Sequence, residues 1–201
     1  LYADAVFLKL GERYFKEQGN WRNGAKAVKQ ILSGYAGINL KRAAIFDGSG
    51  LSRYNLISPK QMSSVLSFLY HAFPISHEFI SALPVAGRDG TLQKRFLLGE
   101  ELAKVRAKTG SMRGVVSLSG FLPNINHHRL AFSMMINGIA GRSRASLYRY
   151  RLLEDKLCQK LMKSKLRNKV VIHKQKPLPF LARPSFENQQ TTYENKLLSL
   201  E

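Results

Sequence analysis

Lys108, Thr109, Gly110 and Ser111 place one amine and two hydroxyl groups within four consecutive residues. The residues at 105–109 alternate between apolar and polar types, which predicts a strand whose alternate side chains share a face. Lys108 and Gly110 would point to one side, and Thr109 and Ser111 to the other. A positive charge with hydroxyl donors suits a carboxylate ligand, and Gly110 lets a substrate backbone come close. Taken alone, the triplet Lys-Thr-Gly is also compatible with an ordinary exposed strand end.

A second polar cluster, containing Ser52 and Asn55, follows the Gly- and Ser-rich stretch at 47–51. A serine hydroxyl can relay a proton, and an asparagine amide can hold the amide of a substrate in place. Ser49 is the alternative to Ser52 for the proton relay. Taken alone, this composition is also typical of a plain turn.

Together the two clusters resemble the penicillin-recognising enzymes, whose motifs include Ser-x-x-Lys, a Ser/Asn motif and Lys-Thr-Gly. The closer resemblance is to the D-alanyl-D-alanine carboxypeptidase/endopeptidases, the class C low-molecular-mass penicillin-binding proteins. It covers residues 1–160, as the C-terminal part of such a protein. Four blocks in the family's order carry it: Trp-Arg-Asn-Gly at 21–24, Asp-Gly-Ser-Gly-Leu-Ser-Arg-Tyr-Asn-Leu at 47–56, Leu-Pro-Val-Ala-Gly-Arg-Asp-Gly-Thr-Leu at 83–92, and Ala-Lys-Thr-Gly-Ser at 107–111 with Gly114 and Val115.

The resemblance implies a role for each matched residue. Lys108 would set the positive field of the groove. Thr109 and Ser111 would contact the terminal carboxylate of a D-Ala-D-Ala peptide or the matching acid of a β-lactam, and the backbone N–H of Ser111 would serve the oxyanion hole. Ser52 would pass a proton to the leaving amine, and Asn55 would hold the peptide amide.

Two departures from the family pattern bear on catalysis. The second motif is usually Ser-x-Asn, whereas Ser52 and Asn55 are three positions apart. The nucleophile motif Ser-x-x-Lys occurs nowhere in the 201 residues, and Thr91 with Lys94 has the spacing but not the serine. Because the family's nucleophile lies far upstream, we expect it in a missing N-terminal portion or a separate chain. This chain alone would then be inactive, because loss of the nucleophile costs roughly a million-fold in rate.

Other reactive side chains carry weaker signals. His127 and His128 form a pair without a third ligand at sensible spacing, so we expect no metal site, and nothing indicates a cofactor. Cys158 has no activating motif and is interpreted as a packed or half-exposed thiol. Basic residues interleaved with tyrosines at 142–151 are compatible with a nucleic-acid surface, but we favour the solvated face of a helix.

The elements that must position these residues follow from periodicity and turn signals. Helices are expected over about 6–15, 25–32, 59–69, 77–83 and 144–162, with Gly34 ending the second and Ser58 capping the third. Strands are expected at 43–46, 105–109, 115–121 and 129–136, the last two joined by a hairpin loop near 123–127. Helices before and after a strand meander predict an α+β domain, with helices packed on an antiparallel sheet. By resemblance, this is the β-lactamase/transpeptidase-like fold without its N-terminal portion.

The length and the charge of the chain indicate its domain organisation and its classes of partner. One domain, the C-terminal part of a transpeptidase-like domain, is expected over 1–163, and a basic, proline-containing tail over 164–201, extended or disordered. Residues 1–15 do not form a signal peptide, so an export signal for the periplasm or cell envelope is expected upstream. The net charge of +19 favours polyanions such as anionic envelope polymers. A non-catalytic wall-peptide-binding remnant and a basic nucleic-acid-binding domain remain alternatives.

Overall fold

The first two helices pack tightly against each other in the computed structural model, which describes residues 1–96, 103–140 and 144–166. Helix α1 (Tyr2–Phe15) contacts α2 (Trp21–Ala36). The side chain and backbone of Asn20 form a reciprocal capping box with Asn23 at the start of α2. The predicted end of this helix at Gly34 is wrong, because the helix continues to Ala36 and Gly37 adopts the left-handed conformation.

Helix α3 (Pro59–His71) begins where the sequence predicts, with Ser58 as N-cap and a proline in the first turn. The shorter helix α4 (Ile75–Ser81) starts two residues before the predicted one. The strand expected at 43–46 is wrong. A single bridge joins Ala44 to Leu56, and the structure places no further strand pairing there among the described residues. The chain at 43–57 is therefore a long loop, and Phe46 is half exposed.

Three strands form an antiparallel meander in the order β1 (Arg106–Met112), β2 (Val115–Pro123) and β3 (Arg129–Asn137). All three predicted strands are confirmed, and β1 extends beyond the predicted end through Gly110 to Met112. The tight turn at Arg113–Gly114 joins β1 to β2, and residues 124–128 form the predicted hairpin loop. The whole Lys108–Ser111 cluster therefore lies on an edge strand.

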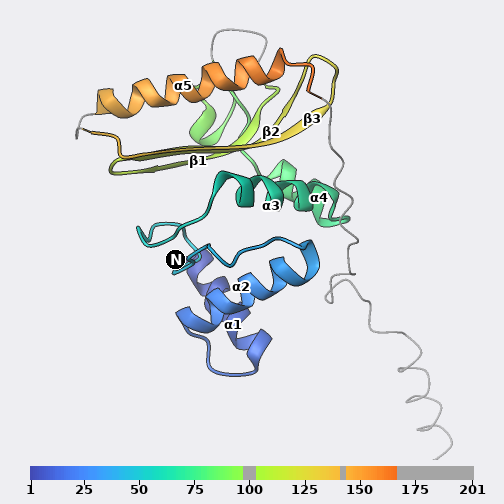
Figure 1. Ribbon diagram of the computed structural model, residues 1–201, viewed down its shortest axis with the longest axis vertical. Coiled ribbons are helices and arrows are strands. Elements are labelled where there is room, and N and C mark those ends of the chain that lie inside the picture. Colours follow the sequence, from blue (N-terminus) through green and yellow to red (C-terminus); the bar gives the residue numbers. More distant parts are fainter. Residues whose placement is uncertain (97–102, 141–143, 167–201) are drawn as a thin grey trace, which may run out of the picture.

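The sheet is covered on both faces (Figure 1). Helix α5 (Arg144–Met162) lies on one face, and α3 with α4 lies on the other, with α1 and α2 beyond them. One apolar core joins the sheet to α5, and a second joins the end of α2 to α3. This is the predicted α+β arrangement. The expected tail beyond residue 166 lies outside the described residues.

None of the helices in the described part of the chain combines the length and hydropathy that a membrane crossing needs. Cys158, on α5, is fully buried in the core between this helix and the sheet. Burial raises the pKa of its thiol to about 12, so of the two alternatives, packed or half-exposed, the structure shows the packed thiol.

The contact between α1 and α2 generates a stability prediction. A Cβ atom on Gly24 would lie 2.7 Å from the carbonyl oxygen of Phe7, whereas one on Gly34 would meet nothing within 4 Å. We expect Gly24→Ala to lower the free energy of unfolding by about 1–3 kcal/mol through overpacking. Gly34→Ala should raise it by up to about 1 kcal/mol, because alanine favours the helix. Urea unfolding followed by circular dichroism measures both. Equal effects of the two substitutions would contradict this packing.

Candidate active site

The outer edge of β1 is paired only at its beginning. Val85 forms a bridge with Arg106, the N–H of Ala107 donates to the carbonyl of Pro84 at 3.0 Å, and the N–H of Ala86 donates to the carbonyl of Val105 at 2.9 Å. Within the described residues, no strand continues this pairing beyond Ala107. Because N–H groups alternate between the two edges of a strand, those of Thr109 and Ser111 point outward like that of Ala107. The chain thus presents a short, free strand edge with two aligned donors.

The side chains of this strand divide between the two faces of the sheet as predicted. Thr109 pairs with Leu118, which lies in the core beneath α5, so Thr109 and Ser111 face α5. Lys108 pairs with Ser119 and therefore faces α3, where its side chain is exposed. Its amine donates to the carbonyl of Thr109 at 2.8 Å. Gly110 pairs with Ser117, and a Cβ atom there would lie 2.3 Å from the Ser117 hydroxyl, which would have to rotate away to make room.

Both hydroxyl side chains line a cavity of about 850 Å³ between β1, the segment around 91–96 and α5. The hydroxyl of Thr109 donates to that of Thr91 at 2.8 Å. Nη2 of Arg151, on α5, donates to Oγ of Ser111 at 3.1 Å. The cavity also contains the side chains of Lys94 and Lys156, so it is predominantly cationic around the two hydroxyls.

Sequence reasoning missed the buried ion cluster beneath this cavity. Arg95 donates to Asp155 from Nη2 at 2.5 Å and from Nε at 3.0 Å, and to Glu154 at 3.1 Å. All three side chains are at most 12% exposed. Burial raises the pKa of both carboxyl groups above their ordinary values, against the opposing effect of the Arg95 charge. The cluster fixes α5 to the segment after the short 3₁₀-helix η1 (Gly90–Leu92).

Two carboxylates organise the loop that carries Ser52 and Asn55. Asp4, on α1, accepts hydrogen bonds from the N–H groups of Gly48 and Ser49, and Asp47 lies within the loop itself. Asp47 accepts hydrogen bonds from the N–H groups of Gly50 and Ser52, from the hydroxyl of Ser49 and from the amide of Asn55. Partial burial raises the pKa of Asp47, but the four hydrogen bonds together outweigh it and lower the pKa. Asp47 therefore holds the loop as a charged group.

The side chain of Asn55 is engaged within this loop on both sides. Its amide nitrogen donates to Asp47 at 2.6 Å, and its oxygen accepts from the N–H of Phe46 at 2.7 Å. These contacts favour a structural role in the loop. The Ser52 hydroxyl accepts from the N–H of Tyr54 at 3.3 Å and is half-buried. Its own proton therefore stays available for a relay.

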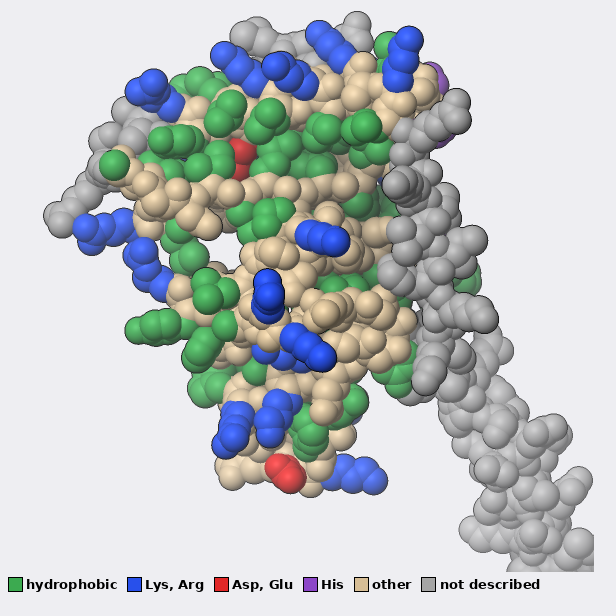
Figure 2. Space-filling model, in the orientation of Figure 1, with side chains coloured by type: hydrophobic (Ala, Val, Ile, Leu, Met, Phe, Trp, Pro, Cys, Tyr) green, Lys and Arg blue, Asp and Glu red, His purple; other side chains and the backbone are tan. Residues whose placement is uncertain are grey.

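The two predicted clusters approach each other only at one end. Arg53, beside Ser52, donates to the carbonyl of Arg113 in the β1–β2 turn at 3.2 Å. Within the part of the chain that the structure describes, no hydrogen bond joins Ser49, Ser52 or Asn55 to the segment 108–111. Figure 2 shows an opening through the molecule between the sheet and the helices and loops that lie below it in this view. The structure thus keeps the two clusters apart from each other.

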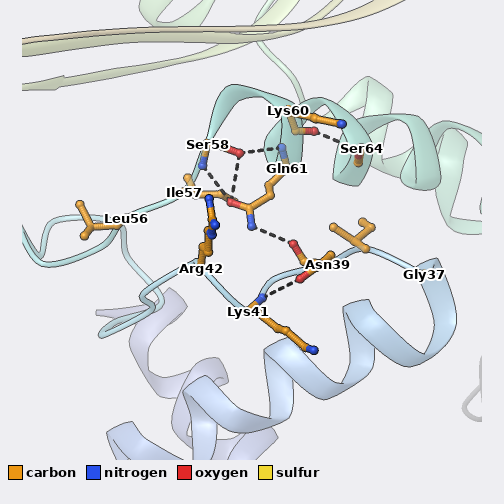
Figure 3. A pocket seen from close by; sticks show the side chains of 11 residues that line it. Gly37, Asn39, Lys41, Arg42, Leu56, Ile57, Ser58, Lys60, Gln61 and Ser64 are labelled. Carbon is orange, nitrogen blue, oxygen red and sulfur yellow. Dashed lines mark hydrogen bonds between the residues drawn. The ribbon is translucent and has the colours of Figure 1, made fainter.

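A second cavity, of about 800 Å³, lies between the 37–42 segment and the start of α3 (Figure 3). Gln61 spans it and donates to the carbonyl of Asn39 at 2.8 Å. Among the described residues that line it, none is acidic, and Lys41, Arg42 and Lys60 are cationic. It contains none of the sequence-predicted site residues.

Comparison with known families decides the assignment. The model of the D-Ala-D-Ala carboxypeptidase 3 (S13) family matches residues 1–152 of the 201. The chain belongs to this family. The resemblance expected over residues 1–160 is confirmed.

Two S13-type relatives show how much of such a protein this chain represents. The D-alanyl-D-alanine carboxypeptidase DacB of Haemophilus influenzae is 41% identical over 138 residues, which are 68% of this chain and 28% of that protein. The D-alanyl-D-alanine carboxypeptidase of an Actinomadura species is 38% identical over 128 residues, 61% of this chain and 23% of that protein. The chain therefore spans about a quarter of the length of these relatives.

Solved structures confirm the penicillin-recognising fold. Penicillin-binding protein 4 (dacB) of Haemophilus influenzae superposes with a TM-score of 0.73 at 35% identity, covering 81% of this chain and 36% of that one. The same protein complexed with a β-lactam gives a TM-score of 0.69 at 36% identity, covering 78% of this chain and 38% of that one. A predatory endopeptidase of Bdellovibrio bacteriovorus, at 19% identity and a TM-score of 0.56, covering 88% and 43%, shares the fold.

The ion cluster generates a pH-dependent stability prediction. Arg95→Met would leave two buried carboxylates without their cation, at a cost of about 3–5 kcal/mol at neutral pH. Because burial already raises both carboxyl pKa values, the stability tied to these groups is present at low pH and lost as pH rises through the folded pKa values. The deficit of the variant should therefore shrink toward acid pH. Urea unfolding at neutral and mildly acid pH tests this, with the exposed Lys104→Met as control. Equal stability of the two variants at both pH values would refute the role of the cluster.

The Asp47 loop generates a prediction for local opening. Asp47→Asn turns one carboxylate oxygen into a donor, so it loses acceptors for the loop and should raise amide hydrogen exchange at Gly50 and Ser52. In the unsubstituted chain, a lowered pKa means that the loop contacts persist above the unfolded pKa and are lost as pH falls through the folded one. Exchange protection factors measured by NMR test both effects, with the exposed Glu17→Gln as control. Unchanged protection in Asp47→Asn would show that the loop does not depend on this carboxylate.

Proposed function

We propose that this chain supplies the sheet edge and the carboxylate pocket of a serine-type D-Ala-D-Ala carboxypeptidase/endopeptidase that acts on peptidoglycan stem peptides. The observation that carries the proposal is the free outer edge of β1 over 108–111. It combines outward N–H groups with two hydroxyls that line one cationic cavity. Membership of the S13 family supports the same reaction class.

The edge is suited to an extended peptide, because a peptide can add to a free strand edge through main-chain hydrogen bonds. The carboxylate of a terminal D-alanine would reach the hydroxyls of Thr109 and Ser111. The outward N–H of Ser111 would then face the scissile carbonyl as one oxyanion-hole donor, a contact that contributes roughly 3–4 kcal/mol in other hydrolases. Lys108, on the other face, would add positive charge on the side that faces α3.

The loop at 47–55 would form the opposite wall of the groove. Its Ser52 hydroxyl keeps a free proton and is our candidate for the relay to the leaving amine, with Ser49 as the alternative. For Asn55, the proposed contact with the peptide amide would require it to exchange a hydrogen bond inside the loop. We therefore propose the role of Ser52 in proton transfer as the main contribution of this loop, and the contact of Asn55 with the substrate as a lesser one.

The nucleophile and its lysine would come from residues outside these 201, because the Ser-x-x-Lys motif does not occur within them. Penicillins would acylate that serine, and the pocket on β1 would hold the acid group of the drug. The periplasm or cell envelope is the proposed location. The basic surface, including Lys41, Arg42 and Lys60 in the second cavity, would favour anionic envelope polymers as further partners (Figure 3).

Intact-mass measurement after incubation with benzylpenicillin tests this function. We expect no mass change for the chain alone, and a gain of one acyl group on the serine-containing part once that part is supplied. Ser111→Ala and Thr109→Val should slow that acylation by about tenfold or more, because a hydrogen bond to a charged group is lost. Ser81→Ala, exposed at the end of α4, is the matched control.

Two other results would redirect the assignment. Acylation of the chain alone would place a nucleophile within these residues. No acylation in either mixture, together with saturable binding of D-Ala-D-Ala peptides, would leave a non-catalytic wall-peptide-binding protein. Salt-sensitive binding to random DNA without any response to penicillins would support the nucleic-acid alternative.

A further inference from the structure

The carboxylate pocket on β1 needs a cation on its own face of the sheet. Lys108 does not meet this need, because it faces α3 and its amine is bonded to the carbonyl of Thr109. Arg95 is also committed, since its guanidinium is buried between Asp155 and Glu154. A carboxylate bound to the hydroxyls of Thr109 and Ser111 would therefore need its positive charge from another side chain.

Arg151 is in the position to provide that charge. It projects from α5 into the same cavity, and Nη2 donates to Oγ of Ser111 at 3.1 Å. Lys94 and Lys156 also line the cavity, but among the described contacts neither donates to a hydroxyl of β1. Arg151 is thus the cation that touches the predicted binding group directly.

The backbone beneath Arg151 is held in place. Its carbonyl oxygen accepts a hydrogen bond from Nη2 of Arg95 at 2.9 Å. Arg95 in turn is fixed by Asp155 and Glu154 in the adjacent turn of the helix. A ligand-binding arginine carried on such an anchored helix turn loses less freedom when a ligand binds.

The chemistry of the pair Arg151 and Ser111 fits a carboxylate. The serine oxygen accepts from the guanidinium, so its own proton is free to donate into the cavity. The guanidinium is planar and carries further N–H donors in a fork that matches the two oxygens of a carboxylate. An ammonium group at this position would supply charge without that geometry.

We propose that Arg151 binds the terminal carboxylate of the D-Ala-D-Ala peptide, together with Ser111 and Thr109. This inference rests on the proposed function, and it adds a specificity-determining residue that the Lys-Thr-Gly-Ser cluster does not contain. It makes the site selective for peptides that end in a free acid over peptides whose C-terminus is blocked. The sequence places Arg151 among basic helix residues interpreted as a solvated face; its side chain is indeed exposed, and the contact with Ser111 adds a binding role to it.

The test is equilibrium binding of two probes to the full chain, an N-acetylated peptide ending in D-Ala-D-Ala and its C-terminal amide. Calorimetry or NMR titration should show that the chain prefers the acid. Arg151→Gln should weaken binding of the acid by about tenfold or more and leave binding of the amide unchanged. Arg151→Lys should keep part of the preference for the acid. Lys160→Gln removes the same charge from an exposed position on the same helix, and it should bind like the unsubstituted chain.

Several outcomes would overturn the inference. In the first, Arg151→Gln is folded, as judged by its unfolding temperature, and binds the acid as tightly as Lys160→Gln does. Arg151 would then have no part in the carboxylate site, while binding by the unsubstituted chain would still support the proposed function. If both Arg151 variants lost the same affinity for the acid as for the amide, Arg151 would have a structural role only. The unsubstituted chain could also bind neither probe while penicillin acylation still depends on Ser111. That result would rule out the peptide-carboxylate site but would not contradict the proposed function.

Discussion

The geometry of the site depends on one buried cation. Arg95 joins the segment after η1 to α5, which is almost sixty residues further along the chain, through Asp155, Glu154 and the carbonyl of Arg151. A buried carboxylate that loses its cation is costly, so α5 cannot slide along the sheet without breaking these contacts. One oxygen of the buried Glu154 has no hydrogen-bond partner among the described residues, so part of the cost of burying this carboxyl group is not offset within the cluster.

A second constraint is the way in which the edge of β1 is used. An exposed strand edge invites pairing with other chains, and proteins usually shorten or cover it. Here Pro84 and Val85 pair with the start of the strand, and the turn at 113–114 ends it. Among the described residues, nothing pairs with the outer edge from Lys108 to Met112. So short an edge accommodates a few residues of an extended peptide and not a second sheet. Under the proposed function, the hydroxyl side chains on this edge would bind the carboxylate of that peptide.

Local signals predicted much of this fold, and long-range contacts explain what they missed. The cap at Ser58 and the alternation in the three strands depend on neighbouring residues, so the sequence reveals them. The segment 43–46 has the composition of a strand but finds only one bridge partner. The ion cluster and the contact of Arg151 with Ser111 join residues 40 or more positions apart, for which a single sequence carries no local signal. Asn55 is a different case, because its partner Asp47 is only eight positions away, but the residue types alone do not show that the Asn55 amide is engaged within the loop.

The division of charge between the two faces of the sheet constrains how the proposed reaction could proceed. A peptide added to the β1 edge has its backbone near the plane of the sheet and its substituents alternately above and below. With the carboxylate held beneath α5 by Arg151 and Ser111, the scissile carbonyl lies one residue back, beside the outward N–H of Ser111. Lys108 lies on the opposite face of β1, toward α3, and the 47–55 loop lies on that side of the sheet as well (Figure 1). An attacking serine would therefore approach from the α3 side, where the positive charge of Lys108 favours an anionic nucleophile and a developing oxyanion.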